Sequence, residues 1–197
     1  MPSDSSPALQ NAVRFVALAN LAYFGVEFGV AMAIGSVSLF ADSIDFLEDA
    51  SVNFLILLAL GWSAKARSRT GMLLACILLV PGLATLWTAW QKVGAPVPPD
   101  PILLSLAGAG ALAVNLTCAF VLARFRHHGG SLTKAAFLSA RNDAFANVAI
   151  IGAAIVTSFT SAAWPDLVVG IAIALMNANA AWEVWTAARD EQNDAQS

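Results

Sequence analysis

The sequence predicts an all-α integral membrane protein, a six-transmembrane-helix bundle with both termini in the cytoplasm. The composition is the first observation, because 58% of the 197 residues are hydrophobic and only 12% are charged. Soluble globular domains are far more polar than this. The second observation is a series of apolar stretches long enough to span a bilayer. The third is the uneven distribution of lysine and arginine among the connecting loops.

The apolar stretches define the predicted spans. A spanning helix needs about 20 mainly apolar residues. Six stretches meet this requirement: 13–34, 38–61, 71–91, 101–123, 135–159 and 165–187. Pro81 lies inside the third stretch and predicts a kink there. The domain organisation is therefore a polar tail at 1–12, a transmembrane domain at 13–188 and a polar tail at 189–197.

Lysine and arginine set the predicted orientation. With six spans, eight of them fall on one side of the membrane: Arg14, Lys65, Arg67, Arg69, Arg124, Arg126, Lys134 and Arg189. The opposite side has Lys92 alone. Because loops rich in positive charge stay in the cytoplasm, this asymmetry places both termini there. We expect a multi-pass protein of the cell membrane, in particular a bacterial inner membrane, with the lipid bilayer as its partner.

The composition also argues against other classes. The positive charges are scattered over short loops and form no basic patch, so no nucleic acid is expected as a partner. Cys76 and Cys118 lie singly in apolar stretches, which is typical of small apolar helix residues and not of a redox pair. No convincing cleavage site follows the first stretch, so we expect a retained helix there. No prosthetic group is predicted.

Four carboxylates interrupt the second stretch, in the segment ADSIDFLEDA. At about 100° per residue, Asp45 and Asp49 lie one turn apart, with Asp42 to one side of Asp45 and Glu48 to the other. All four therefore share one helix face of about 120°. Ionised carboxylates are costly at membrane depth unless they are paired, solvated or bound to a cation. This face should point into the bundle or into a water-filled cavity.

The four acids are not equivalent. Asp42 is near the start of the predicted helix, where the helix dipole favours a capping or interfacial role. Glu48 fits either a supporting or proton-carrying role beside the other acids, or a simple polar lining. Asp45 and Asp49 repel each other at this spacing, which indicates that something positive binds between them.

The fifth stretch carries a polar stripe in the segment SARNDAFANV. Ser139, Asp143 and Asn147 follow at intervals of four residues and so lie on one side of a helix. Arg141 projects to the other side, where it is a poor partner for Asp143 and is expected to reach the interface.

Two features connect the second and fifth helices. Both contain the pattern D-A-x-x-N, at 49–53 and 143–147, which fits either chance or the repeated halves of many transporters. If the helices face each other, Asp45, Asp49 and Asp143 converge with Ser139 nearby. Three carboxylates and a neutral oxygen make a site for a divalent cation.

Through these residues the sequence resembles the cation diffusion facilitator family, six-helix metal transporters whose second and fifth helices each carry His or Asp, three residues, then Asp. FADSIDFLEDAS is similar to the second-helix motif, with Asp45 and Asp49 at its metal-binding positions. SARNDAFANVAII is similar to the fifth-helix motif, with Asp143 at the aspartate position. The resemblance covers the whole six-helix region.

The sequence departs from the family pattern in two places. Ser139 stands where the family usually has His or Asp, so the fourth ligand is left open among Ser139, Asn142, Asn147 and water. The sequence given ends at Ser197, and we therefore expect a form without the family's cytoplasmic metal-binding and dimerising domain. A homodimer is expected from the resemblance alone.

Other polar residues carry weaker signals. Glu27 in the first stretch either lines an access path and relays protons, or pairs with Asn20 or a neighbouring helix. Adjacent His127 and His128 are typical of a solvated loop and indicate metal capture only weakly. Interhelical hydrogen bonds are expected of three further residues: Asn115, Asn177 and Asn179.

The resulting prediction is a secondary transporter that exports divalent transition-metal cations from the cytoplasm in exchange for protons, and not an enzyme. Burial and mutual repulsion favour protonated carboxyl groups, whereas metal binding requires carboxylates, so metal ions and protons compete for one site. The resemblance implies Zn²⁺ as the cargo, with Co²⁺, Fe²⁺, Cd²⁺ and Mn²⁺ open. The cation is the transported substrate and no catalytic residues are predicted.

Two alternatives use the same acids. A proton-coupled carrier of an organic cation would need an aromatic-lined pocket, whereas these helices are rich in small residues. An intramembrane aspartyl enzyme would activate water with Asp pairs on facing helices, but the GxGD context is missing around Asp143.

Overall fold

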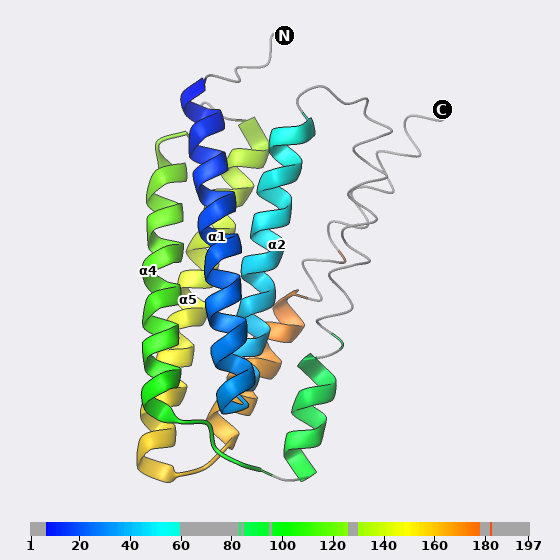
Figure 1. Cartoon of the computed structure of the whole chain (residues 1–197), viewed down its shortest axis with the longest axis vertical. Helices are drawn as coiled ribbons and strands as arrows, with labels where there is room; N and C mark the ends of the chain where they lie inside the picture. The colour runs from blue at the N-terminus through cyan, green and yellow to red at the C-terminus, as the bar shows by residue number, and fades with distance from the viewer. Residues whose placement is uncertain are drawn as a thin grey trace, which may run out of the picture.

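The computed structural model describes residues 7–59, 83, 85–94, 96–125, 130–177 and 182, and all regular structure in these ranges is helical (Figure 1). The long helices are α1 (Pro7–Ile34), α2 (Val37–Ala59), α4 (Pro101–Ala123) and α5 (Gly130–Thr160). Shorter helical segments are described at 85–94 and at Trp164–Asn177. The predicted all-α fold is confirmed for this part of the chain.

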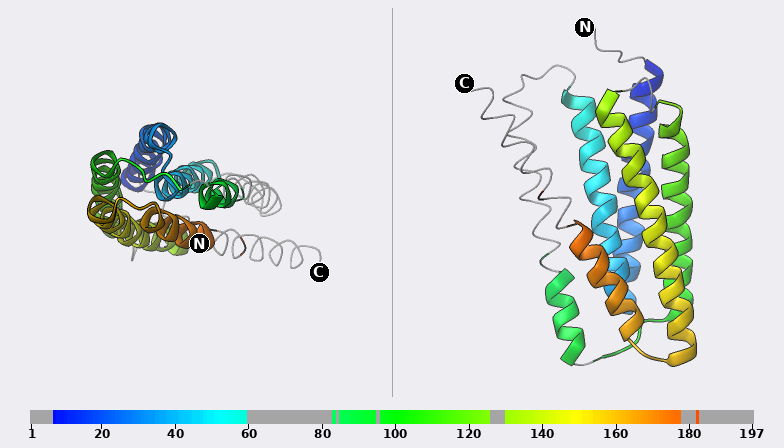
Figure 2. Two further views of the ribbon diagram at one scale, coloured as in Figure 1. Left: turned by 90° about the horizontal axis from the view of Figure 1, so that it is seen from below. Right: turned by 180° about the vertical axis from the view of Figure 1, so that it is seen from behind.

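Four helices form a bundle. α1 packs along α2 and α5 packs along α4, while α1 also contacts α4 and α2 contacts α5. Each helix is therefore adjacent to two others around the bundle axis. The helical segments 85–94 and Trp164–Asn177 lie outside this ring, on the side of α2 (Figures 1 and 2). The second and fifth helices are thus in contact, which meets the condition set above for the convergence of their acids.

Local sequence signals set the helix ends. The Asp100 side chain accepts two backbone N–H groups of the first turn of α4, at 2.8 and 2.9 Å, and Pro101 follows, where no N–H donor is needed. Between α1 and α2, Gly35 adopts a φ of 63°, which glycine tolerates without strain. Ser36 Oγ then caps α2 by accepting the N–H of Leu39 at 3.1 Å.

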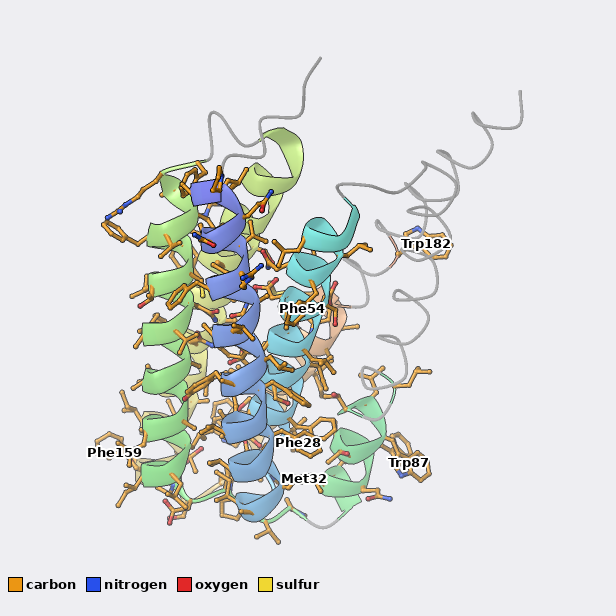
Figure 3. All side chains as sticks on the ribbon, turned by 45° about the horizontal axis from the view of Figure 1, so that its top comes forward. Phe28, Met32, Phe54, Trp87, Phe159 and Trp182 are labelled. Atoms are coloured by element: carbon orange, nitrogen blue, oxygen red, sulfur yellow. The ribbon has the colours of Figure 1, made fainter. Side chains whose placement is uncertain are left out.

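Large apolar side chains cover the outside of the bundle. Phe159 is 85% exposed and Trp87 is 62% exposed, and both point away from the helices (Figure 3). Such a surface is unfavourable in water and suits lipid. Pro7–Ile34, Pro101–Ala123 and Ser139–Thr160 have the length and composition to cross a membrane. α2 has 23 residues and is long enough as well, but it carries the four carboxylates.

The charges at the two ends of the bundle follow the predicted asymmetry. The start of α1 and the end of α4 lie at one end of the bundle (Figure 1). The first half of α1 carries Arg14, and Arg124 is the C-cap residue of α4. Lys92 lies at the other end, where it donates a hydrogen bond to the carbonyl of Gly35. In the part of the chain that the structure describes, Lys92 is the basic residue at the end of the bundle predicted to face away from the cytoplasm.

Helix boundaries differ from the apolar stretches at two places. α1 begins at Pro7, inside the segment predicted as a polar tail, and α5 begins at Gly130 and not at 135. An apolar stretch marks the lipid-facing part of a helix, and helical hydrogen bonding continues through polar turns beyond it. Several predictions concern positions outside the described residues: Cys76, Pro81, His127, His128 and Asn179.

Candidate metal centre

Asp49 on α2 is held from two other helices. Its Oδ1 accepts a hydrogen bond from Ser139 Oγ on α5 at 3.0 Å, and its Oδ2 accepts one from Asn20 Nδ2 on α1 at 3.4 Å. The thiol of Cys118 on α4 donates in turn to Asn20 Oδ1 at 3.7 Å. Side chains of all four bundle helices therefore meet at this level.

Asp45 and Asp143 lie beside this contact. Asp143 lies one helical turn after Ser139 on the same side of α5, and the largest charge interaction at Asp45 is with Asp143. All three aspartates are half-buried. The structure thus brings the carboxyl groups of Asp45, Asp49 and Asp143 into one region of the α2–α5 interface, with Ser139 between the helices.

These carboxyl groups are not closed around one point. Within the described ranges, no group of three His, Cys, Asp or Glu side chains is arranged to hold a metal ion. Both oxygens of Asp49 instead accept hydrogen bonds from Ser139 and Asn20. In this arrangement Asn20 on α1 and Ser139 on α5 each donate a hydrogen bond to one carboxylate oxygen of Asp49.

A second polar network surrounds Asp42, which is fully buried. Asn147 Nδ2 on α5 donates to Asp42 Oδ2, while Asn147 Oδ1 accepts from Asn115 Nδ2 on α4 at 3.0 Å. Both ends of the Asn147 amide are therefore occupied. Asn177 Nδ2 donates to the carbonyl of Ala41 on α2 at 3.5 Å, so the interhelical roles expected of Asn115 and Asn177 are confirmed.

The capping role predicted for Asp42 is wrong. α2 begins at Val37, and Asp42 therefore lies in its second turn, where backbone N–H groups already have intrahelical partners. The free N–H groups of the first turn are bonded by Asp166, whose carboxylate accepts from the backbone N–H of Val37 at 2.9 Å and of Ser38 at 3.1 Å.

Asp166 is a residue that the sequence analysis missed. It is fully buried and accepts hydrogen bonds from the hydroxyls of Ser36 and Ser38 at 2.7 and 2.6 Å. Lys92 Nζ lies 3.1 Å from Asp166 Oδ2. We call Ser36, Ser38, Lys92 and Asp166 the end clasp. The signal that could have revealed it is the position of Asp166 at the start of the sixth apolar stretch, on the same predicted side of the membrane as Lys92.

The remaining predicted residues of α2 and α5 differ in exposure. Glu48 is half-buried, and Asp49 is the acid that acts most strongly on it. Asn142 is exposed, and its Oδ1 accepts from Arg141 Nη2 at 3.3 Å. Arg141 is itself exposed, as predicted. Asn142 therefore bonds to its neighbour on α5 and makes no described contact with α2.

Glu27 on α1 is fully buried. Neither of its carboxylate oxygens has a hydrogen-bond partner among the described residues. Pairing with Asn20, one of the expected alternatives, is wrong because the Asn20 amide is bonded to Asp49 and Cys118. The acid that acts most strongly on Glu27 is Asp42.

Comparison with known proteins identifies the family. The family model of the cation efflux transmembrane domain matches residues 13–190. The chain belongs to the cation efflux family. The resemblance to the cation diffusion facilitators is thereby confirmed, and the match includes α2, α5 and every residue of the candidate centre. No curated protein matches the sequence.

Membership has a direct functional consequence. Cation efflux proteins are membrane transporters and not enzymes, so this cation efflux protein is a cation transporter formed by a membrane helical bundle. Its exposed apolar surface and its buried acids agree with that role.

Proposed function

We propose that this protein exports a divalent transition-metal cation from the cytoplasm in exchange for protons. Zn²⁺ is the first candidate, and Asp45, Asp49 and Asp143 bind it. The observation that carries the proposal is the hydrogen bond from Ser139 to Asp49, which joins the two helices that bear the three acids. Carboxylates brought together at membrane depth require a cation or protons to offset their charge.

Ser139 is proposed as the fourth, neutral oxygen donor. It already contacts Asp49 and lies one turn before Asp143 on the same side of α5. Two other residues fit less well: the Asn142 side chain is exposed, and the Asn147 carbonyl oxygen accepts from Asn115. An all-oxygen donor set also suits harder ions such as Mn²⁺ and Fe²⁺. The proposed range of cargo therefore includes these two ions, and Co²⁺ and Cd²⁺ stay open beside them.

Proton coupling follows from the chemistry of the ligands. A buried carboxyl group without a cation is most stable when protonated, whereas a metal ligand must be deprotonated. Metal binding therefore releases protons and proton binding releases metal. The cation replaces the hydrogen bonds that Asn20 and Ser139 make to Asp49, and a change in helix packing then opens the centre to the other side.

The proposed topology has six spans in the cell membrane, a bacterial inner membrane, with both termini in the cytoplasm. Support comes from the position of Arg14 and Arg124 at one end of the bundle and Lys92 at the other, because basic residues favour the cytoplasmic side. A homodimer belongs to the proposal on family grounds alone.

The test is proton movement driven by metal in liposomes that hold a pH-sensitive dye. Zn²⁺, Co²⁺, Mn²⁺ and Cd²⁺ are added in turn to the wild type, to Asp49→Asn and to Asp100→Asn. Asp100 is a matched control because it is an exposed aspartate that caps α4. We expect a metal-specific signal that is lost in Asp49→Asn and kept in Asp100→Asn.

Two results would count against the proposal. Proton movement that is the same in Asp49→Asn as in the wild type would separate transport from the candidate centre. An absence of movement with every metal, in folded and inserted protein, would favour a proton-coupled carrier of an organic cation.

A further inference from the structure

We propose a second binding site for the transported cation, formed by Glu27 on α1 and Asp42 on α2. The inference rests on the proposed function, because it places a further station for the same divalent cation on its path. Both side chains are 0% exposed. Glu27 and Asp42 keep the same antiparallel register of α1 and α2 as the contacting residues Asn20 and Asp49, so two fully buried acids from different helices lie on facing sides of the α1–α2 contact.

The pair is short of hydrogen-bond donors. Glu27 Oε1, Glu27 Oε2 and Asp42 Oδ1 have no hydrogen-bond partner among the described residues, and only Asp42 Oδ2 is satisfied, by Asn147. The hydroxyl of Tyr23, the titratable neighbour on α1, donates elsewhere, to the carbonyl of Ala107 at 2.6 Å. Buried acceptors are nearly always partnered in folded proteins, so three buried oxygens without a described partner on two facing acids indicate an absent ligand.

A divalent cation satisfies these oxygens better than a proton does. One shared proton bonds two of the three oxygens and leaves a net negative charge in the bundle, whereas two protons neutralise the pair but bring no partner from outside it. A divalent cation neutralises both carboxylates and can be coordinated by all three oxygens, two from a bidentate Glu27 and one from Asp42.

The register of α1 and α2 places this pair about two helical turns from Asp49, with Asp45 of the main centre one turn from Asp42. Asn20 and Asp49 are in contact across the two helices. Glu27 lies seven residues after Asn20 and Asp42 lies seven residues before Asp49, so both pairs keep the same antiparallel register. Seven residues of helix correspond to about 10 Å. The pair therefore lies nearer the end of the bundle that carries Lys92 and the end clasp.

This position gives the site its role. A cation that leaves Asp45, Asp49 and Asp143 toward the end of Lys92 meets Glu27 and Asp42 next. Asn147 holds Asp42 from α5, so the second site also draws on both faces of the α2–α5 interface. A site with two acids binds more weakly than one with three, which suits a station on the way out.

The experiment counts Zn²⁺ ions bound per chain by equilibrium dialysis of the purified full-length protein. Glu27→Gln and Asp49→Asn are each compared with the wild type, together with the double variant. We expect each single variant to bind one ion fewer and the double variant to bind two fewer. Asp42→Asn serves as the second variant for the pair in case Glu27→Gln does not fold, and helical circular dichroism checks each protein.

The outcomes separate this inference from the proposed function. A Glu27→Gln protein that binds as many ions as the wild type overturns the second site, and so does a double variant that loses no more than either single one. If Glu27 and Asp42 bind only protons, the Glu27→Gln protein will bind as many Zn²⁺ ions as the wild type. A wild-type count in Asp49→Asn, with one ion lost in Glu27→Gln, would keep the second site and overturn the main centre.

Discussion

Ser139 on α5 donates a hydrogen bond of 3.0 Å to Asp49 on α2, and this contact joins the two helices that carry the acids of the candidate centre. A hydroxyl at this position orients the carboxylate and is close enough to bind a cation beside it. The identity of residue 139 therefore bears on both the geometry and the affinity of the centre.

Ser139→Ala should weaken Zn²⁺ binding by about 10-fold, the loss typical when a group that orients a metal ligand is removed. Isothermal titration calorimetry of purified protein measures the change. Ser158→Ala is the matched control, because Ser158 is an exposed serine of the same helix that bonds only to its own backbone, at Ile155. Equal affinities in the two variants would show that Ser139 has no part in the site.

Zn²⁺ binding should weaken as the pH falls, because protons and the metal ion compete for the same carboxylates. For each proton that the metal displaces, a fall of one pH unit lowers the affinity about 10-fold. This holds at pH values where the carboxyl group is protonated in the metal-free protein. Calorimetry between about pH 6 and about pH 8 measures the slope. An affinity that does not change with pH would mean that no proton is displaced, and would contradict the antiport.

Asn147→Ala should destabilise the bundle by about 2 kcal/mol, since it leaves the buried Asp42 and Asn115 each without a partner. Unfolding in mixed detergent micelles measures the loss. Asn142→Ala removes the same side chain from an exposed position of α5 and should change the stability by less than about 0.5 kcal/mol. If the two variants are equally stable, the network around Asn147 contributes nothing.

Lys92→Met should cost about 3 kcal/mol, because it leaves the carboxylate of Asp166 buried without its cation. The same unfolding assay applies. Arg14→Met removes an exposed positive charge and should have little effect. A Lys92→Met protein as stable as Arg14→Met would show that the hydroxyl and N–H donors to Asp166 suffice.

Gly170→Ala should disturb the start of α2 strongly, since a Cβ at this position would lie 2.7 Å from the backbone carbon of Val37. Backbone atoms cannot move aside as a flexible side chain can. Gly152→Ala is the control, because a Cβ there meets nothing within 4 Å and alanine favours helix. Thermal unfolding should separate the two, with a lower midpoint for Gly170→Ala alone.

Sequence periodicity predicted the long helices that the structure describes and pointed to α2 and α5 as a pair, because apolar length and the spacing of the acids are local properties. The hydrogen-bond partner of each acid could not be predicted in this way, because the partners lie on other helices, far away in the sequence. Asp42 and Asp166 are about 120 residues apart in sequence, and the choice between them as the cap of α2 depends on where Trp164–Asn177 packs. Asn20 likewise looked like a partner for Glu27, yet its amide reaches Asp49 on the neighbouring helix.

The end clasp fixes α2 at one end and leaves the acids at a distance from that anchor. Asp49 lies 12 residues beyond Val37, which is about 18 Å along a helix. If α2 tilts by about 10° about the end clasp, the backbone of Asp49 moves by about 3 Å. Metal–oxygen bonds tolerate only about 0.2 Å. Because Asp49 lies so far from the end clasp, a small rotation of α2 is enough to form or break the bonds between Asp49 and a bound metal ion.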